Sequence, residues 1–206
     1  KGSPMRRRAA LLLCLGLAAC GTTQADLTYA PPSPLPPRPG ARPVVTITQV
    51  VDRREEARTD PHWIGAVRTD YGASVKDLRT QVPAADEVRQ AFSDALQARG
   101  LLAPEPASAR YSLDVDILGL EARQISRRAG TAQFRITLRS INGGGIVLVD
   151  QEDAAFVSSD LIMPTSGVFS ASEPLRQITQ QAMSEAIDRL LDRPSFAMIV
   201  QHGWGE

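Results

Sequence analysis

Apolar and polar residues alternate most regularly in the middle of the chain. Apolar side chains occupy every second position from Tyr111 to Ile117, and again from Ala132 to Leu138. This spacing is typical of strands with one buried and one solvent face. A glycine-rich turn at Asn142–Gly145 and an apolar run at Ile146–Val149 follow. We therefore predict three antiparallel strands joined by turns.

Two other segments place their apolar residues on one face of a helix. The first follows Pro83, carries apolar residues from Val88 to Leu96 and stops at Gly100. The second begins at a capping box, Ser170–Glu173, and continues through an apolar stripe to Leu191. Each helix needs a surface on which to bury its apolar face.

The remaining elements have shorter patterns. Val44–Val51 is β-branched and predicts a first strand, Trp63–Val67 suits a short strand or hairpin arm, and Phe196–Val200 suits a closing helical turn or an edge strand. We expect an α+β fold. It is a two-layer sandwich in which a mainly antiparallel sheet of about four strands carries two helices on one face, in the order β-α-β-β-β-α.

The N-terminal segment has the pattern of an export signal. Lys1–Pro4 looks like the remnant of an expression tag, and residues 5–19 combine a basic start with an apolar run. That run is much shorter than the ~20 residues of a membrane-spanning helix. Leu17–Cys20 resembles the lipobox of bacterial lipoproteins. This resemblance implies removal of the signal peptide and attachment of a diacylglycerol to the sulfur of Cys20. Gly21 in the next position favours the periplasmic face of the outer membrane.

Residues 20–42 are rich in proline and predict an extended tether. At ~3.1 Å per residue, about a dozen such residues would reach roughly 40 Å. We expect a single domain at 43–201 that folds without the tether, followed by a short tail at 202–206. The alternative for the proline-rich segment is a ligand for a proline-recognition module.

The charge of the chain excludes one class of partner. Loss of Lys1 and Arg6–Arg8 from 23 basic residues leaves 19 against 23 acidic residues, so the mature chain has a net charge of −4. Nucleic-acid-binding surfaces are basic, and we expect no nucleic-acid partner. Basic clusters at Arg53–Arg54 and at Arg123, Arg127 and Arg128 suit either anionic lipid head groups or simple solubility. Because Cys14 is discarded and Cys20 is acylated, the mature chain has no disulfide.

No residue pattern predicts catalysis. A nucleophile would need a histidine or an equivalent base as its partner. His62 lies in an irregular segment and His202 in the tail, and we expect both to be exposed loop histidines. Asp114 and Asp116 form a carboxylate pair on one strand face, but the alternation already explains them as a solvated face. We expect no enzymatic activity, no metal site and no cofactor.

Two apolar features stand in otherwise polar segments and are our candidates for contact with a partner. The first is Trp63, and the second is the connection before the last helix, which contains Leu161, Ile162, Met163 and Phe169. Long connections with apolar tips are often functional. The alternative is that these side chains fold back over one end of the core.

Several of these features together resemble the YajG-like lipoproteins of the bacterial envelope. They are the lipobox, the strand running into Val51–Arg54, the helix closing on Ala98–Gly100, the antiparallel strands and the final helix. We expect a membrane-anchored, non-enzymatic module that binds an envelope protein. The architecture also resembles auxiliary lipoproteins of envelope transporters, which leaves open an accessory role in lipid or lipopolysaccharide transport. A hydrolase of envelope polymers is the alternative from another class.

Overall fold

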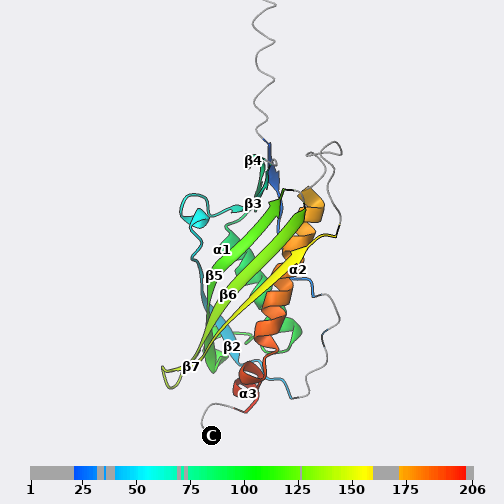
Figure 1. Cartoon of the computed structure of the whole chain (residues 1–206). Coiled ribbons are helices and arrows are strands. Elements are labelled where there is room, and N and C mark those ends of the chain that lie inside the picture. Colours follow the sequence, from blue (N-terminus) through cyan, green and yellow to red (C-terminus); the bar gives the residue numbers. More distant parts are fainter. Residues whose placement is uncertain are drawn as a thin grey trace, which may run out of the picture.

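The computed structural model describes residues 21–31, 35, 40–68, 71, 74–125, 127–159 and 172–202. Within these residues the chain forms a seven-stranded mixed sheet and three α-helices (Figure 1). The strands are β1 (Gly21–Gln24), β2 (Val45–Asp52), β3 (Trp63–Arg68), β4 (Ser74–Arg79), β5 (Tyr111–Gln124), β6 (Arg128–Ser140) and β7 (Ile146–Val157). The helices are α1 (Ala84–Ala98), α2 (Ser172–Leu191) and α3 (Pro194–His202), with short 3₁₀ turns at Glu56–Arg58 and Pro106–Ser108. No helix of the described residues is long and apolar enough to cross a membrane.

The long strand β5 organises the sheet because it changes partners along its length. The strand order is β1-β4-β3-β5-β6-β7, and β2 also pairs with β5. The first half of β5 lies parallel to β2, and its second half lies parallel to β3, with Gly65 opposite Ala122. On its other edge β5 pairs with β6 in antiparallel fashion, and β6 pairs with β7 in the same way.

The predicted fold class is wrong in the size, direction and order of its elements. We expected about four mainly antiparallel strands and two helices. Instead, β1, β3 and β4 extend the sheet, three of its strand pairs are parallel, and α3 is a third helix. Parallel pairing joins segments far apart in sequence and leaves no local pattern, while β1 and β4 are too short and polar to show alternation.

The core lies between the sheet and the two long helices. In Figure 1, α1 and α2 lie on the same side of the sheet, and their apolar faces are buried against it. Phe92 of α1 meets Phe134 of β6 edge to face, with ring centroids 5.6 Å apart. Such a pair contributes about 0.5–1.5 kcal/mol beyond the area it buries.

Residues 21–31 belong to this packed domain, whereas the sequence predicted a tether there. β1 pairs in parallel with β4, and Gly21 lies opposite Lys76. The side chains of Ala25 and Leu27 are 1% and 2% exposed and are part of the core. The backbone N–H of Leu27 also donates to the Glu87 carboxylate at 3.1 Å. The proline-rich segment therefore connects two parts of one domain and does not separate position 20 from it.

Candidate functional site at one end of the sheet

The side chains considered for catalysis make structural contacts. The Nδ1 of His62 donates to the backbone carbonyl of Thr80 at 3.1 Å, and the side chain of His202 is not among those described. Asp114 accepts from the Nε of Arg139 at 3.2 Å. Within the part of the chain that the structure describes, no group of three His, Cys, Asp or Glu residues could hold a metal ion.

Asp116 forms the centre of an ion-pair network on the solvent face of the sheet. It accepts from Arg53 at 3.0 Å and from Arg135 at 2.9 Å. Partial burial alone would raise the pKa of this carboxyl, but the hydrogen bonds and charges of both arginines outweigh burial and lower its pKa. The pair Asp114 and Asp116 thus contributes cross-strand ion pairs instead of a free acid and base.

Arg54 is a buried guanidinium at the point where β5 changes partners. It forms a bidentate pair with Asp52 at 2.9 and 2.5 Å. Its Nη1 also donates to the carbonyl oxygens of Trp63 at 3.1 Å and Leu120 at 2.7 Å. Arg54 therefore ties the end of β2 to β3 and β5. The sequence places Arg54 in a basic cluster with Arg53. Nothing in the residues around it indicates that its side chain is buried.

A second buried guanidinium, Arg99, joins three segments of the chain. It donates to Asp188 at 2.7 Å, to Asp192 at 2.8 and 3.0 Å, and to the hydroxyl of Tyr29 at 2.9 Å. The hydroxyl of Tyr29 in turn donates to Asp188 at 2.5 Å. Burial, together with the hydrogen bond to Asp188, raises the pKa of Tyr29 to about 12. This cluster fastens the N-terminal segment to α1 and α2.

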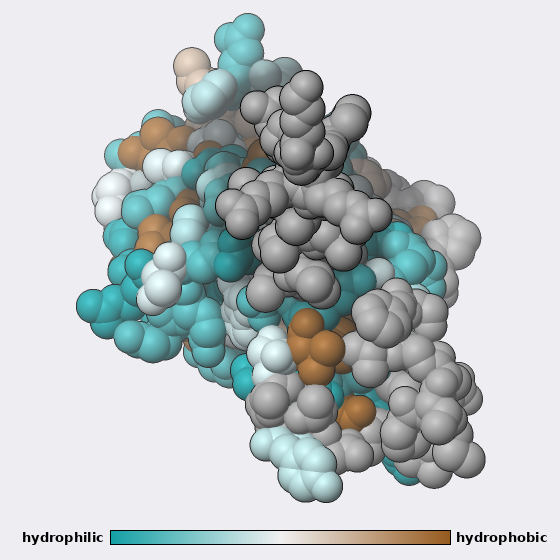
Figure 2. Space-filling view, turned by 90° about the horizontal axis from the view of Figure 1, so that it is seen from above, coloured by the Kyte–Doolittle hydropathy of each residue, from teal (hydrophilic) through white to brown (hydrophobic). Residues whose placement is uncertain are grey.

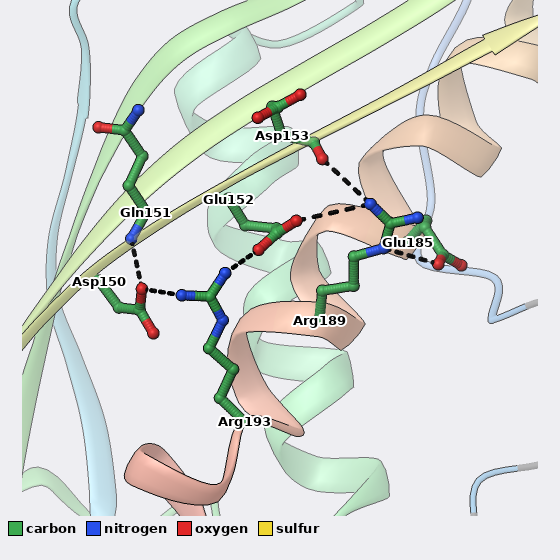
Figure 3. Close-up of polar contacts among 7 residues, drawn as sticks. All are labelled: Asp150, Gln151, Glu152, Asp153, Glu185, Arg189 and Arg193. Carbon is green, nitrogen blue, oxygen red and sulfur yellow. Dashed lines mark hydrogen bonds and ion pairs between the residues drawn. The ribbon is translucent and has the colours of Figure 1, made fainter.

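A third ionic cluster holds β7 against the end of α2 (Figure 3). Arg193 donates to Asp150 and Glu152 of β7. Arg189 donates to Glu152 at 3.5 Å and to Glu185 of its own helix at 2.9 Å. Each arginine is occupied by carboxylates from this protein, so the cluster is a structural fastening of the last strand.

Of the predicted partner contacts, the structure describes only Trp63. Trp63 begins β3, where the sequence predicted a short strand, and its side chain is half-buried. Its position is fixed by the hydrogen bond from Arg54 to its carbonyl, so it lies in the sheet and not at the tip of a loop. The other predicted contacts, Leu161, Ile162, Met163 and Phe169, and the predicted lipid-attachment residue, Cys20, lie outside the described residues.

Strand register brings several connections to one end of the sheet (Figure 1). Gly21, the first residue of β1, lies opposite Lys76 near the start of β4, beside the tip that joins β3 to β4. Val67 near the end of β3 lies opposite Gln124 at the end of β5. Val157, the last residue of β7, lies opposite Ala129 near the start of β6. We call this region the β1 end. It comprises Gly21, Arg68, Tyr71, Val75, Lys76, Arg123, Ile125, Arg127 and Val157.

The β1 end combines exposed apolar side chains with basic ones. Tyr71 is 100% exposed and Val157 is 59% exposed, and Val75 and Ile125 are also exposed. Figure 2 looks down on this end and shows apolar residues interrupting a mainly hydrophilic surface. The sequence could not bring these side chains together, because they come from three segments that are far apart along the chain.

Two arginines of the β1 end, Arg123 and Arg127, have no carboxylate partner among the described residues, unlike the arginines on the sheet face. Arg123 and Arg127 are exposed, and no ion pair joins either to another described residue. Glu173, at the start of α2, pairs with Arg176 at 2.6 Å, and Asp77 of β4 accepts from the Ser74 hydroxyl at 3.0 Å. The arginines on the sheet face and beside α2, in contrast, are bound to carboxylates.

Comparisons with known proteins show a solved structure with a similar fold, but they do not assign the chain to a family. No family model matches the chain, and no curated protein matches it. A DUF330 protein from Xanthomonas campestris has a similar structure, with a TM-score of 0.58 and 16% identity over 87% of this chain and 95% of that one. A minor lipoprotein from Acinetobacter baumannii matches with a TM-score of 0.35 and 9% identity, over 66% of this chain and 91% of its own. The first similarity shows the fold alone, and the resemblance to the YajG-like family is not confirmed.

Proposed function

We propose that the chain is a lipid-anchored, non-enzymatic binding module of the bacterial envelope. The observation that carries this proposal is the lipobox-like sequence Leu17–Cys20, which leads directly into a strand of the folded domain. Two or more acyl chains on Cys20 would give stable membrane attachment, whereas one would bind only reversibly. The residue after the cysteine, Gly21, favours the periplasmic face of the outer membrane.

The contacts of the polar side chains support a binding role over catalysis. General acid–base and nucleophilic mechanisms need a titratable group that is free to meet a substrate. Asp114, Asp116 and His62 are each engaged with a neighbour in this domain. The envelope-polymer hydrolase is therefore the weaker proposal.

A second candidate is an accessory subunit of a lipid or lipopolysaccharide transport machine. Such a subunit needs an exposed apolar or basic surface for its partner or its lipid. The β1 end offers one, because Tyr71, Val157, Arg123 and Arg127 are all exposed there. Trp63 and the segment 161–169 stay our predicted contacts for a protein partner.

Lipid labelling of two cysteine variants tests the anchor. Cys20→Ser should abolish incorporation of labelled fatty acid and release the protein from membranes, because the acylated sulfur is lost. Cys14→Ser is the matched control, since that residue lies in the segment we expect to be removed. Undiminished labelling of the Cys20→Ser variant would contradict the proposal.

A further inference from the structure

We propose that the β1 end docks on anionic phospholipid head groups, so that the domain lies directly against the membrane with this end facing it. The inference rests on the proposed anchor at Cys20 and adds an orientation and a lipid-binding surface. Its occupant is the phospholipid bilayer itself, not a protein partner or a second copy of the chain.

The first observation is the short path from the lipid to the fold. Consecutive Cα atoms are about 3.8 Å apart, and Gly21, which follows Cys20, is already paired with Lys76 of β4. Leu27 in the core and Tyr29 in the Arg99 cluster hold the rest of this segment in place. An acyl chain on Cys20 would therefore have no tether between it and the domain, which would keep the β1 end within reach of the head groups.

The second observation is that this end has the chemistry of a membrane interface. Arg123 and Arg127 are exposed, without ion pairs to other described residues, and suit the phosphates of anionic head groups. Tyr71 is fully exposed, and aromatic rings with a polar edge favour the boundary between head groups and hydrocarbon. Val75 and Ile125 add exposed apolar area at the same end. Each basic residue at an anionic surface strengthens attachment by roughly fivefold.

The opposite end of the sheet provides a matched comparison. β5 has 14 residues, and at about 3.3 Å per residue it separates the two ends by roughly 40 Å. The far end also has exposed apolar side chains, including Ile146 at 53% exposure, and an exposed arginine, Arg42. The types of exposed side chain thus do not distinguish the two ends. The ends differ in their distance from Cys20.

The test places a fluorescent label at each end of the lipidated, full-length mature protein. Tyr71→Cys or Ile125→Cys marks the β1 end, and Ile146→Cys is the control. In each variant the new residue is the only free thiol once Cys20 is acylated. The proteins are reconstituted in vesicles of phosphatidylethanolamine and phosphatidylglycerol whose acyl chains carry bromine. We expect strong quenching at positions 71 and 125 and little at position 146.

Charge reversal then tests the role of the arginines. In the Tyr71→Cys protein, Arg123→Glu with Arg127→Glu should lower the equilibrium constant for docking about tenfold or more, and Arg42→Glu should leave it unchanged. Equal quenching at both ends, or quenching at position 71 that ignores the double reversal, would overturn the inference.

Two further outcomes separate this inference from the proposed anchor. The mass of the N-terminal peptide is measured in the same preparation. Lipid on Cys20 with unquenched labels at positions 71 and 125 would overturn the docking surface alone, and protection of those labels only in native envelopes would assign the surface to a protein. An unmodified Cys20 would overturn the anchor and the orientation with it.

Discussion

Arg99 shows how a single side chain can connect parts of a protein that are distant in sequence. Its guanidinium is buried and binds Tyr29, Asp188 and Asp192. Replacement of Arg99 by Met should lower the free energy of unfolding by about 3–5 kcal/mol, because Asp188 then stays half-buried without its cation. Urea unfolding measures this change.

The control for this substitution is Arg58→Met. Arg58 pairs with Glu55 at the surface, with both side chains largely exposed, and such a pair contributes about 0–1 kcal/mol. Equal destabilisation by the two substitutions would show that the Arg99 cluster does not stabilise the domain.

Tyr29 gives the same cluster a dependence on high pH. Its pKa rises from the ordinary 10.0 to about 12 in the folded protein. A group with a raised pKa contributes stability that is complete below its unfolded pKa and is lost as the pH rises through its folded pKa. The contribution of Tyr29 should therefore disappear between about pH 10 and pH 12.

Ultraviolet difference titration of the protein against Tyr29→Phe isolates this group. The difference should show one tyrosinate that forms near pH 12, and Tyr29→Phe should unfold with a weaker dependence on pH in this range. A difference titration centred at the ordinary pKa of 10.0 would mean that the hydroxyl is not held by Asp188.

At the scale of elements, Gly65 fixes how closely β3 approaches β5. A Cβ at this position would lie 1.9 Å from the carbonyl oxygen of Ala122, and the φ angle of Gly65 is +156°. We expect Gly65→Ala to cost at least the ~1–3 kcal/mol of ordinary overpacking, because backbone must move. Gly145→Ala is the control, since nothing lies within 4 Å of its Cβ position. Thermal unfolding of both variants checks this, and a neutral Gly65→Ala would contradict the tight pairing.

The N-terminal segment is an element of the core that the sequence did not reveal. Leu27 is 2% exposed, so Leu27→Ala should destabilise the domain by about 2–5 kcal/mol. Ile141→Ala, at a position 45% exposed, should cost far less. A chain that begins at Gly40 should be less stable still, contrary to our expectation that the domain folds without residues 20–42. An unchanged unfolding midpoint for both Leu27→Ala and the shortened chain would contradict the packing of this segment.

Elements with a strong local period were predictable, and their arrangement was not. The alternation at Tyr111–Ile117 and Ala132–Leu138 and the apolar stripe ending at Leu191 identify β5, β6 and α2. β1 has the polar sequence Gly-Thr-Thr-Gln, and its strand conformation depends on pairing with β4. Parallel pairing of β2 with β5 likewise depends on distant segments. Of the site, the sequence indicated the arginine cluster but not its place at the same end of the sheet as Gly21.

At the scale of the whole molecule, the position of the N-terminal strand changes how a lipid anchor would act. A tether of about a dozen proline-rich residues would hold the domain up to roughly 40 Å from the lipid. In the structure those residues instead follow β1 and the buried Leu27. With an anchor at Cys20 and the β1 end on the bilayer, the sides of the domain and the end opposite Gly21 would stay open to a protein partner.

The most direct measurement is neutron reflectometry of the lipidated protein on a supported bilayer. We predict that protein density begins at the head groups with no solvent layer, because Cys20 leads straight into β1. A variant with a flexible spacer inserted between Cys20 and Gly21 is the control, and it should show a resolved gap when charge attraction is screened by salt. A solvent layer of tens of ångströms beneath the unaltered protein would contradict the account.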